Sequence, residues 1–533
     1  MSIVPIASLR PTAPATVWAP VAGPIVIGKD VLELLSSSMY VDPMCIYREY
    51  VQNAADAIDE ARASGVLDSR SAGLVDVKID ARARSIKIRD NGIGVAGSEF
   101  EKWLVSFGAS HKRGQGLRGF RGVGRLAGLG YCQEVTFRSC AHGELTSHEL
   151  SWDCRKLRTV LRGSADQEKT LVDLVRETAS VRSIPVTDKA NHFFEVELAG
   201  VVRHRNDQLL DPTSVAFYLA QVAPVPFSEE FAFAKDVLQA LGSEVVLGQL
   251  NLHITGIDGP IRRPHRDQIS IRQKETDSFR TIEPISIPGP DGGTAAVGWI
   301  AHHAYAGALP AASGVRGLRL RCGDIQIGDD RLLEEIFLEP RFNSWAVGEI
   351  HVVDRRITPN GRRDHFEQNN HFQHVLTHLI PIGRDISKRC RTSSVQRNRS
   401  RDVFLTIERL EESLAIVRQG SLGKADRARL VREVKAAIPE LEKRIGTTIM
   451  EDRDRPLAGA KVTNLKRQLS RIENQTSGKS PLTKLPDTER RAFEKVLSLI
   501  YECAPNRSAA KVLVDRLLAR IPRAVKNSEA RSE

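Results

Sequence analysis

The sequence has no apolar run that approaches the roughly 18 to 20 residues needed to cross a membrane. Its seven cysteines are an odd number, lie far apart and include no CxxC pair, which argues against a disulfide framework and a zinc site. The first 29 residues lack a basic segment and contain several prolines, so a signal peptide is not expected. These absences predict a cytoplasmic protein with no membrane partner.

Several common catalytic motifs are also missing. The chain contains no HExxH pair, no nucleophilic serine elbow, no cluster of metal-binding cysteines and no glycine-rich P-loop ending in GK[ST]. Hydrophobic residues make up 41% and charged residues 27% of the chain, as is ordinary for a globular protein. A length of 533 residues predicts roughly three to four domains.

The net charge of +11 is unevenly distributed. Residues 371–533 contain 34 Lys and Arg against 20 Asp and Glu, whereas the rest of the chain contains 43 against 46. A basic excess of this kind attracts phosphate backbones or other acidic partners. The alternative is a solvated helical surface that is rich in arginine.

Three regions follow an N-terminal extension of residues 1–29. Residues 30–200 mix helical and strand patterns, and the alternating runs LVDVKID and SIKIRD predict a hairpin of half-buried strands. Residues 201–370 contain many short β-rich runs broken by Gly and Pro. Residues 371–533 carry apolar residues at intervals of three and four, which predicts a helical bundle. The expected fold class is α/β, with two α/β domains followed by an all-α domain.

A helix predicted over residues 43–63, with Asp42 as its N-cap, places Glu49, Asn53 and Asp56 on one face. An amide oxygen such as that of Asn53 is a suitable ligand for Mg²⁺ that bridges nucleotide phosphates. A carboxylate such as that of Glu49 can orient or deprotonate an attacking water. The alternative is an ordinary exposed polar face.

A second motif, Asp90-Asn-Gly92-Ile-Gly94, ends the second strand of the predicted hairpin. Its glycines let the backbone turn sharply and approach a flat ligand. A buried carboxylate at Asp90 can accept a hydrogen bond from an exocyclic amine such as that of adenine. A plain hairpin turn is the alternative.

The third motif is the glycine-rich stretch 106–130, which includes Gly119, Gly122 and Gly124. Glycines free backbone N–H groups to surround an anion, and basic neighbours such as Lys112 add positive charge. The apolar run after Gly124 predicts a helix whose N-terminus faces phosphate. A merely flexible loop is the alternative.

Together and in this order, the three motifs resemble the GHKL ATPases, which comprise gyrase-type topoisomerases, heat-shock protein 90 chaperones, histidine kinases and MutL, with the MORC proteins beside them. The resemblance implies a Bergerat fold, an α/β sandwich that binds ATP with Mg²⁺. It implies that Glu49 is the general base, Asn53 the Mg²⁺ ligand and Asp90 the adenine acceptor. Further nucleotide contacts are implied at Asp56, Gly92, Gly94, Lys112, Gly119, Gly122, Val123 and Gly124.

The stretch 331–369 resembles the middle-domain loop of heat-shock protein 90. This resemblance implies that Arg363 reaches the γ-phosphate, although the adjacent Arg362 could take the role and a basic surface turn is the alternative. The sequence also departs from the family, because Phe194 stands near the place where a threonine is usual. That departure puts one phosphate or water contact in doubt.

Two functions follow from the resemblance. One is an ATP-driven chaperone-like clamp, in which a homodimer held by the C-terminal helices closes on a protein client. The other is a MORC-like or MutL-like nucleic-acid clamp that uses the basic helices. The resemblance to heat-shock protein 90 at Arg363 favours the first function, and the positive charge of residues 371–533 favours the second. A nucleotide-binding regulator without hydrolysis is a third alternative, against which Glu49 argues.

Overall fold

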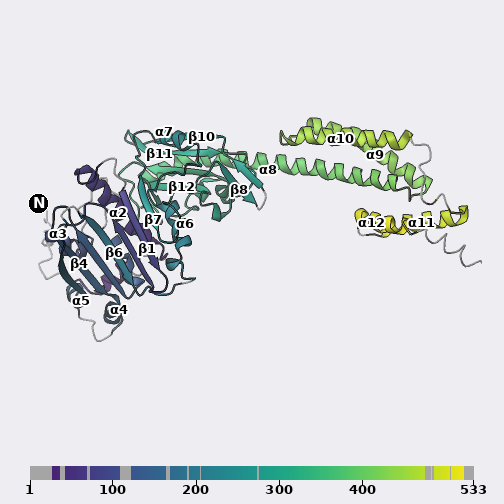
Figure 1. Cartoon of the computed structure of the whole chain (residues 1–533). Coiled ribbons are helices and arrows are strands. Elements are labelled where there is room, and N and C mark those ends of the chain that lie inside the picture. Colours follow the sequence, from purple (N-terminus) through teal and green to yellow (C-terminus); the bar gives the residue numbers. More distant parts are fainter. Residues whose placement is uncertain are drawn as a thin grey trace, which may run out of the picture.

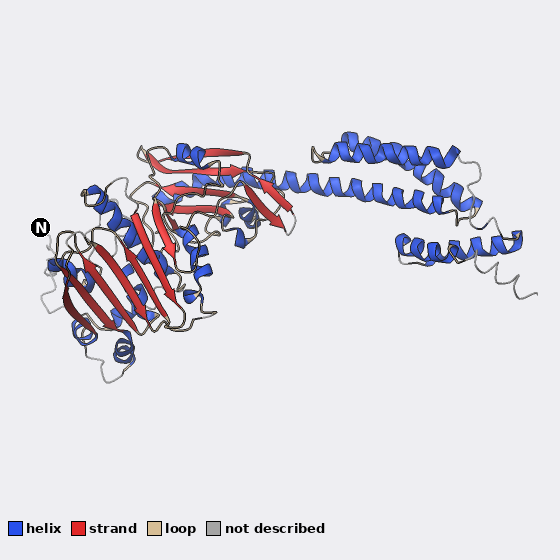
Figure 2. Cartoon of the chain, viewed as in Figure 1, coloured by secondary structure: helices blue, strands red, loops and turns tan. Residues whose placement is uncertain are grey.

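The computed structural model describes most of the chain, with two β-sheet units first and a series of helices after them (Figures 1 and 2). The described residues are 27–36, 42–68, 73–108, 122–163, 169–188, 191–204, 206–272, 275–474, 482, 485–504 and 506–520.

A seven-stranded sheet with the order β5-β4-β3-β6-β2-β1-β7 forms the first unit. Its strands are β1 (Gly73–Asp80), β2 (Ser85–Asp90), β3 (Glu134–Cys140), β4 (Thr146–Asp153), β5 (Ala179–Pro185), β6 (Phe193–Ala199) and β7 (Leu250–Ile254). Its helices are α1 (Asp30–Ser36), α2 (Cys45–Ala63), α3 (Gly97–Val105), the 3₁₀ helix η1 (Gly124–Gly130), α4 (Cys154–Arg162) and α5 (Leu171–Thr178). β1 and β2 pair antiparallel, which confirms the predicted hairpin.

The first sheet extends further along the chain than residue 200, where the sequence predicted the first domain to end. β7 pairs in parallel with β1, with Leu252 opposite Val75. Helix α6 (Pro212–Val222) contacts α2 and also β13 of the second unit. The chain therefore joins the two units through elements that contact both, and the four domain ranges remain predictions.

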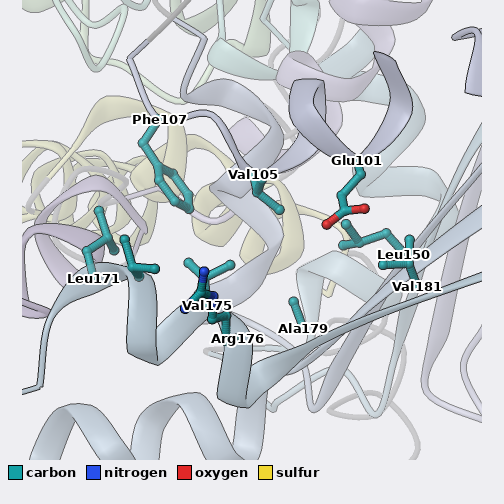
Figure 3. A pocket seen from close by; sticks show the side chains of 10 residues that line it. Glu101, Val105, Phe107, Leu150, Leu171, Val175, Arg176, Ala179 and Val181 are labelled. Atoms are coloured by element: carbon teal, nitrogen blue, oxygen red, sulfur yellow. The ribbon is translucent and has the colours of Figure 1, made fainter. Parts of the chain in front are cut away.

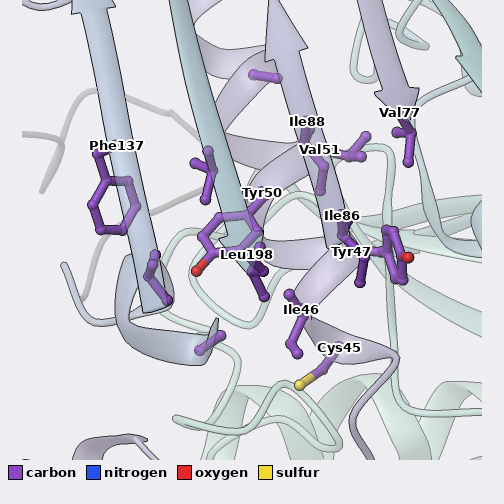
Figure 4. Close-up of a cluster of buried hydrophobic side chains, with 14 of the residues drawn as sticks. Cys45, Ile46, Tyr47, Tyr50, Val51, Val77, Ile86, Ile88, Phe137 and Leu198 are labelled. Carbon is purple, nitrogen blue, oxygen red and sulfur yellow. The ribbon is translucent and has the colours of Figure 1, made fainter. Parts of the chain in front are cut away.

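Helix α2 covers one face of the first sheet and supplies much of its core (Figure 4). Ile46, Tyr50 and Val51 of α2 are buried in the same cluster as Ile86 and Ile88 of β2. Burial of each large apolar side chain contributes about 1.5–3 kcal/mol. This packing fixes which face of α2 the remaining, polar side chains can occupy.

The start of α2 differs slightly from the prediction. The helix begins at Cys45, two residues later than expected. The Asp42 carboxylate accepts a hydrogen bond from the Met44 amide (3.0 Å), and the Asp42 carbonyl accepts one from the Cys45 amide (3.1 Å). Asp42 therefore stabilises a turn that precedes the helix instead of capping the helix itself.

The second unit is built on a five-stranded sheet with the order β10-β11-β14-β12-β13. Its strands are β10 (Thr281–Pro288), β11 (Thr294–His302), β12 (Gly317–Cys322), β13 (Ile325–Ile327) and β14 (Val347–Val352), and β8 (Gln268–Arg272) and β9 (Glu275–Ser278) form a separate pair. The short helices are α7 (Ala234–Leu241) and the 3₁₀ turns η3 (Gln208–Leu210), η4 (Ala311–Ser313), η5 (Glu334–Ile336) and η6 (Pro340–Trp345). The α/β class expected for this region is confirmed.

A buried group of charged side chains ties the second sheet to α6. Arg263 Nη1 lies 2.7 Å from Glu349 Oε2, and Arg321 Nη2 lies 2.6 Å from Glu349 Oε1. The same guanidinium groups donate to backbone carbonyls, from Arg263 Nε to Val225 (3.0 Å) and from Arg321 Nη2 to Gln221 (2.8 Å). Gln221 lies in the last turn of α6, whose carbonyls have no partner within the helix. The ion pairs therefore hold the segment that joins the two units.

Helices alone follow in the rest of the described chain. They are α8 (Asn370–Gln419), α9 (Lys424–Thr447), α10 (Asp454–Asn474), α11 (Asp487–Cys503) and α12 (Arg507–Leu518). Val403 and Ile407 of α8, Val434 of α9 and Val462 of α10 share one buried cluster, which confirms the helical region expected from the spacing of apolar residues. In the described residues, no helix is long and apolar enough to span a membrane.

A first prediction concerns His265, which is buried in the second unit against the rings of Phe227, Phe231 and Trp299. Burial lowers the pKa of its imidazole from 6.5 to about 3. As the pH falls, His265 therefore binds a proton at a higher pH in the unfolded chain than in the folded chain. Stability that is present above pH 6.5 is lost as the pH falls toward 3, by up to about 1.4 kcal/mol per pH unit.

We expect His265→Phe to flatten this part of the pH dependence, because phenylalanine keeps the ring contacts and binds no proton. Urea unfolding of both proteins at several values between about pH 7 and about pH 4 measures the difference. Identical slopes for the two proteins would show that His265 is not the titrating group.

Candidate active site

Helix α2 brings the predicted catalytic carboxylate to a buried surface. Glu49 and Asp56 are 3% and 1% exposed, and Asn53 between them is partly exposed. A side chain at Gly124 would overlap Glu49 Oε2, so the glycine motif passes directly against this carboxylate. The alternative of an ordinary exposed polar face does not hold, because both carboxylates are buried.

Glu49 lies between two guanidinium groups from different parts of the chain. Arg48 Nη2 is 3.4 Å from Glu49 Oε1, and Arg363 Nη2 is 3.5 Å from Glu49 Oε2. Arg363 belongs to the loop between β14 and α8. A hydrogen bond from Arg48 Nη2 to the Arg362 carbonyl (3.0 Å) fastens this loop to α2. A second unit therefore contributes directly to the surroundings of Glu49.

The two candidate arginines of that loop differ clearly in position. The Arg362 side chain is exposed, whereas the Arg363 side chain is 13% exposed and contacts Glu49. Arg363 also has a φ of 56°, in the left-handed region that residues other than glycine rarely adopt. Such a conformation costs about 1–3 kcal/mol and is concentrated at functional loops. Of the two, Arg363 is the residue that the loop directs to the carboxylate.

The Asp90 motif connects β2 to α3 and does not form a hairpin turn. Asp90 is buried, and its Oδ1 accepts a hydrogen bond from the Gly92 amide (2.8 Å). A Cβ at Gly92 would overlap Ala57 of α2, and one at Gly94, which has a φ of 72°, would overlap the Cys140 carbonyl. Both glycines are therefore required by close backbone approach around the Asp90 carboxylate.

The end of the glycine-rich stretch packs against α2. Gly122 has a φ of 66°, Val123 is buried, and the chain continues into η1. The expected helix after Gly124 is thus a 3₁₀ helix and not an α-helix. The Tyr50 hydroxyl donates to the Arg125 carbonyl (3.0 Å) and accepts from the Gly128 amide (3.1 Å), which joins η1 to α2. Lys112 and Gly119 lie outside the described residues.

Phe194, which stands where the family usually has a threonine, lies beside Asp90. The two residues are direct partners in the antiparallel pair of β2 and β6, so both side chains point to the face of the sheet covered by α2. The Phe194 ring makes an edge contact with Trp103 of α3, with centroids 5.5 Å apart. The side chain next to the predicted adenine acceptor is therefore aromatic.

A polar cavity of about 570 Å³ lies where the two units meet. Arg48, Arg362 and Arg363 line it together with Cys45 and Tyr218. Burial raises the pKa of the Cys45 thiol and of the Tyr218 phenol, so both stay neutral near pH 7. Because Arg48 and Arg363 also contact Glu49, this cavity lies directly beside the candidate catalytic carboxylate.

A second cavity, of about 410 Å³, is mostly apolar and lies between α3, α5, β4 and β5 (Figure 3). Phe107, Leu171 and Val175 are among the side chains that line it, together with the charged residues Glu101 and Arg176. None of the predicted nucleotide-binding residues that the structure describes lines this cavity. It is therefore separate from the site around Glu49.

The donor set near Glu49 suits a metal ion that is held mainly by a nucleotide. Within the described residues, no three His, Cys, Asp or Glu side chains gather as they would to hold a metal ion. Mg²⁺ commonly binds through one or two protein oxygens, with phosphate oxygens and waters as the other ligands. The partly exposed amide of Asn53 fits this pattern.

Arg48 has a role that we did not predict from the sequence. It contacts Glu49 and the Arg362 carbonyl, yet an arginine in the middle of a helix has no distinctive pattern. The role of Tyr50, whose hydroxyl fixes η1, was likewise not predicted. Only the long-range contacts reveal these two roles.

Residues 46–180 match the family of histidine kinase-, DNA gyrase B- and HSP90-like ATPases. This part of the chain is a GHKL-type ATPase domain. The chaperone protein HtpG of Idiomarina loihiensis is 27% identical to the chain over 220 residues, and that of Rickettsia akari is 31% identical over 161 residues. The alignments cover 38% and 27% of this chain but only 32% and 25% of the two relatives. The chain therefore spans about a third or less of these chaperones.

A second prediction concerns Gly124 of this ATPase domain. A Cβ at this position would overlap Glu49 Oε2 and move either the carboxylate or the loop. We expect Gly124→Ala to lower ATP turnover by about 100-fold or more, because small displacements of reacting groups are costly. Gly459→Ala on α10 is the control, since its added Cβ meets nothing within 4 Å. Normal turnover by Gly124→Ala in a steady-state assay would mean that the loop does not pack on Glu49 during catalysis.

Proposed function

We propose that the chain hydrolyses ATP with Mg²⁺ and that hydrolysis drives a clamp-like motion of the chaperone type. Glu49 acts as the general base, Asn53 holds Mg²⁺, and Asp90 accepts a hydrogen bond from the exocyclic amine of adenine. The observation that carries the proposal is the contact of Arg363, from the second unit, with Glu49. A hydrolase whose base depends on a remote arginine couples chemistry to domain position.

The guanidinium groups around Glu49 suggest how this coupling operates. Arg48 and Arg363 neutralise the carboxylate in the arrangement described above. A guanidinium binds a phosphate oxygen at least as well as a carboxylate, so Arg363 can transfer to the γ-phosphate of bound ATP. Glu49 then accepts a proton from the attacking water while Arg363 stabilises the charge that develops on the phosphoryl group.

The remaining nucleotide contacts follow the same proposal. The backbone around Gly122, Val123 and Gly124 surrounds the phosphates, with Lys112 and Gly119 as further members of the loop. Gly92 and Gly94 keep the backbone close to the base, and Asp56 borders the site on α2. Bound Mg²⁺ supplies a positive charge that offsets the negative charge of the phosphates.

We further propose that two copies of the chain form a homodimer that closes on a protein client. The ATPase domain, the second α/β unit and the C-terminal helices, predicted at 30–200, 201–370 and 371–533, are the moving parts. Apolar side chains exposed on α11 and α12, such as Phe493 and Val512, support an association through the helical end. The similarity to HtpG supports the chaperone type.

One observation favours a second function, that of an ATP-dependent nucleic-acid clamp. Residues 384–401 of α8 include seven Lys and Arg but only one acidic residue. Arg384 and Lys388 are exposed on neighbouring turns and Arg399 is exposed about three turns later, and none of them forms an ion pair within the described residues. A row of unpaired cations on a helix is suited to a phosphate backbone.

A third prediction tests hydrolysis. Glu49→Gln should still bind ATP but lose about 10²–10⁴ in turnover, because the base is absent. Arg363→Ala should lower turnover by about 10² or more, whereas the adjacent Arg362→Ala should keep turnover within about threefold of the wild type. Isothermal titration with ATP and a phosphate-release assay measure the two quantities. A wild-type chain that binds ATP with Mg²⁺ but releases no phosphate would refute the proposal, and equal effects of the two arginine variants would assign the role to the loop as a whole.

A fourth prediction decides between the two macromolecular partners. If α8 binds a nucleic acid, Lys388→Glu combined with Arg399→Glu should weaken binding to duplex DNA. The slope of log K against log salt concentration should become shallower by the amount that corresponds to about two phosphate contacts. Lys443→Glu combined with Arg444→Glu on α9 changes the net charge equally and serves as the control. DNA affinity that is independent of salt, together with an ATPase that only an unfolded protein stimulates, would exclude the nucleic-acid clamp.

A further inference from the structure

Arg125 is a buried cation that the functions assigned so far do not use. It follows Gly124 directly, and it is 5% exposed. Its Nη2 donates to the Ser106 carbonyl at the end of α3, and its Nε has no hydrogen-bond partner in the described part of the chain. Burial lowers the pKa of its guanidinium to about 10. A buried charge with so few partners is costly, which indicates that its position serves a purpose.

The partners of Arg125 connect the two ends of the nucleotide site. Its guanidinium lies over the ring of Trp103, 5.1 Å from the centroid. Trp103 in turn contacts Phe194, which pairs with Asp90 across β2 and β6. A continuous row therefore runs from the candidate adenine acceptor through two aromatic rings to the residue that follows Gly124.

The backbone of Arg125 is fixed as firmly as its side chain. Its carbonyl accepts a hydrogen bond from Tyr50 of α2, and Tyr50 is the neighbour of Glu49. Gly124, the residue before Arg125, lies close against Glu49. A displacement of the Arg125 side chain by its aromatic partners would therefore be passed to the contact between Gly124 and Glu49.

We propose that Arg125 is a positioning residue for ATP turnover, and that the row formed by Phe194, Trp103 and Arg125 makes the contact of Gly124 with Glu49 depend on the bound base. The proposal rests on the hydrolysis proposed above. Phe194 presents an aromatic surface beside Asp90, to which a purine can add a stacking or edge contact. The planar guanidinium suits the other end of the row, because it bonds a carbonyl and covers a ring at the same time.

The first test separates kcat from binding. We expect Arg125→Gln to lower kcat by about tenfold or more through misplacement of Gly124, while the Kd for ATP changes by less than about threefold. Arg158→Gln is the matched control, because Arg158 also donates to a single backbone carbonyl, that of Cys132 (2.8 Å), in the same domain. Unchanged kcat in Arg125→Gln would overturn the proposal. So would equal losses of kcat, affinity and unfolding temperature in both variants, which would indicate a purely structural role.

The second test does not require hydrolysis and so distinguishes failure of this inference from failure of the ATPase proposal. ADP should change the tryptophan emission of the wild type, because the proposed position of the base is beside Phe194 and the Phe194 ring contacts Trp103. Pyrophosphate, which has phosphates but no base, should not cause this change. Trp103→Phe should abolish the ADP-dependent part, and Phe194→Thr should reduce it. The same ADP response in wild type and Trp103→Phe would overturn the connection between base and row.

Discussion

A buried carboxylate needs partners, and Glu49 takes one from its own helix and one from another part of the chain. Arg48 is its neighbour in sequence, whereas Arg363 comes from a loop more than 300 positions further along. An uncompensated buried charge would be strongly destabilising, so the surroundings of Glu49 are complete only when that loop is docked. The left-handed backbone at Arg363 shows that the loop adopts an unfavourable conformation to reach this position.

The contacts between the two units are of two kinds. Around α6 and β7 the contacts involve regular secondary structure, because β7 pairs with β1 of the first sheet. The guanidinium groups of Arg263 and Arg321 add hydrogen bonds to backbone carbonyls in this region. Around Glu49 they are polar and border a cavity of about 570 Å³. The buried apolar side chains of the first unit and those of the second unit form separate clusters. Polar contacts between units permit relative movement far more readily than a shared apolar core does.

Local patterns were sufficient to predict the parts of the site that depend on local geometry. The alternation before Asp90 predicted β2, and the spacing of Glu49 and Asn53 predicted their placement on α2. The glycines at 92 and 94 were predicted to allow a sharp turn of the backbone, and both are closely packed against neighbouring residues. These features follow from chain periodicity and from the absence of a side chain, both of which can be read from neighbouring residues.

Contacts between distant residues could not be predicted in the same way. Nothing around Arg48 indicates that it would hold the Arg362 carbonyl, and nothing around Trp103 indicates that Arg125 would cover its ring. The preference for Arg363 over Arg362 came only from resemblance, because two adjacent arginines are chemically equivalent in a sequence. Their difference arises from the direction of the backbone at one residue.

The loop that carries Arg363 ends where α8 begins, at Asn370, and α8 continues without interruption for 50 residues. At 1.5 Å per residue the helix is about 75 Å long. A rigid rod of that length moves its far end by about 6 Å when its base turns by about five degrees. A rearrangement of side-chain size beside Glu49 thus becomes, at the other end of α8, a displacement of about half the width of a helix.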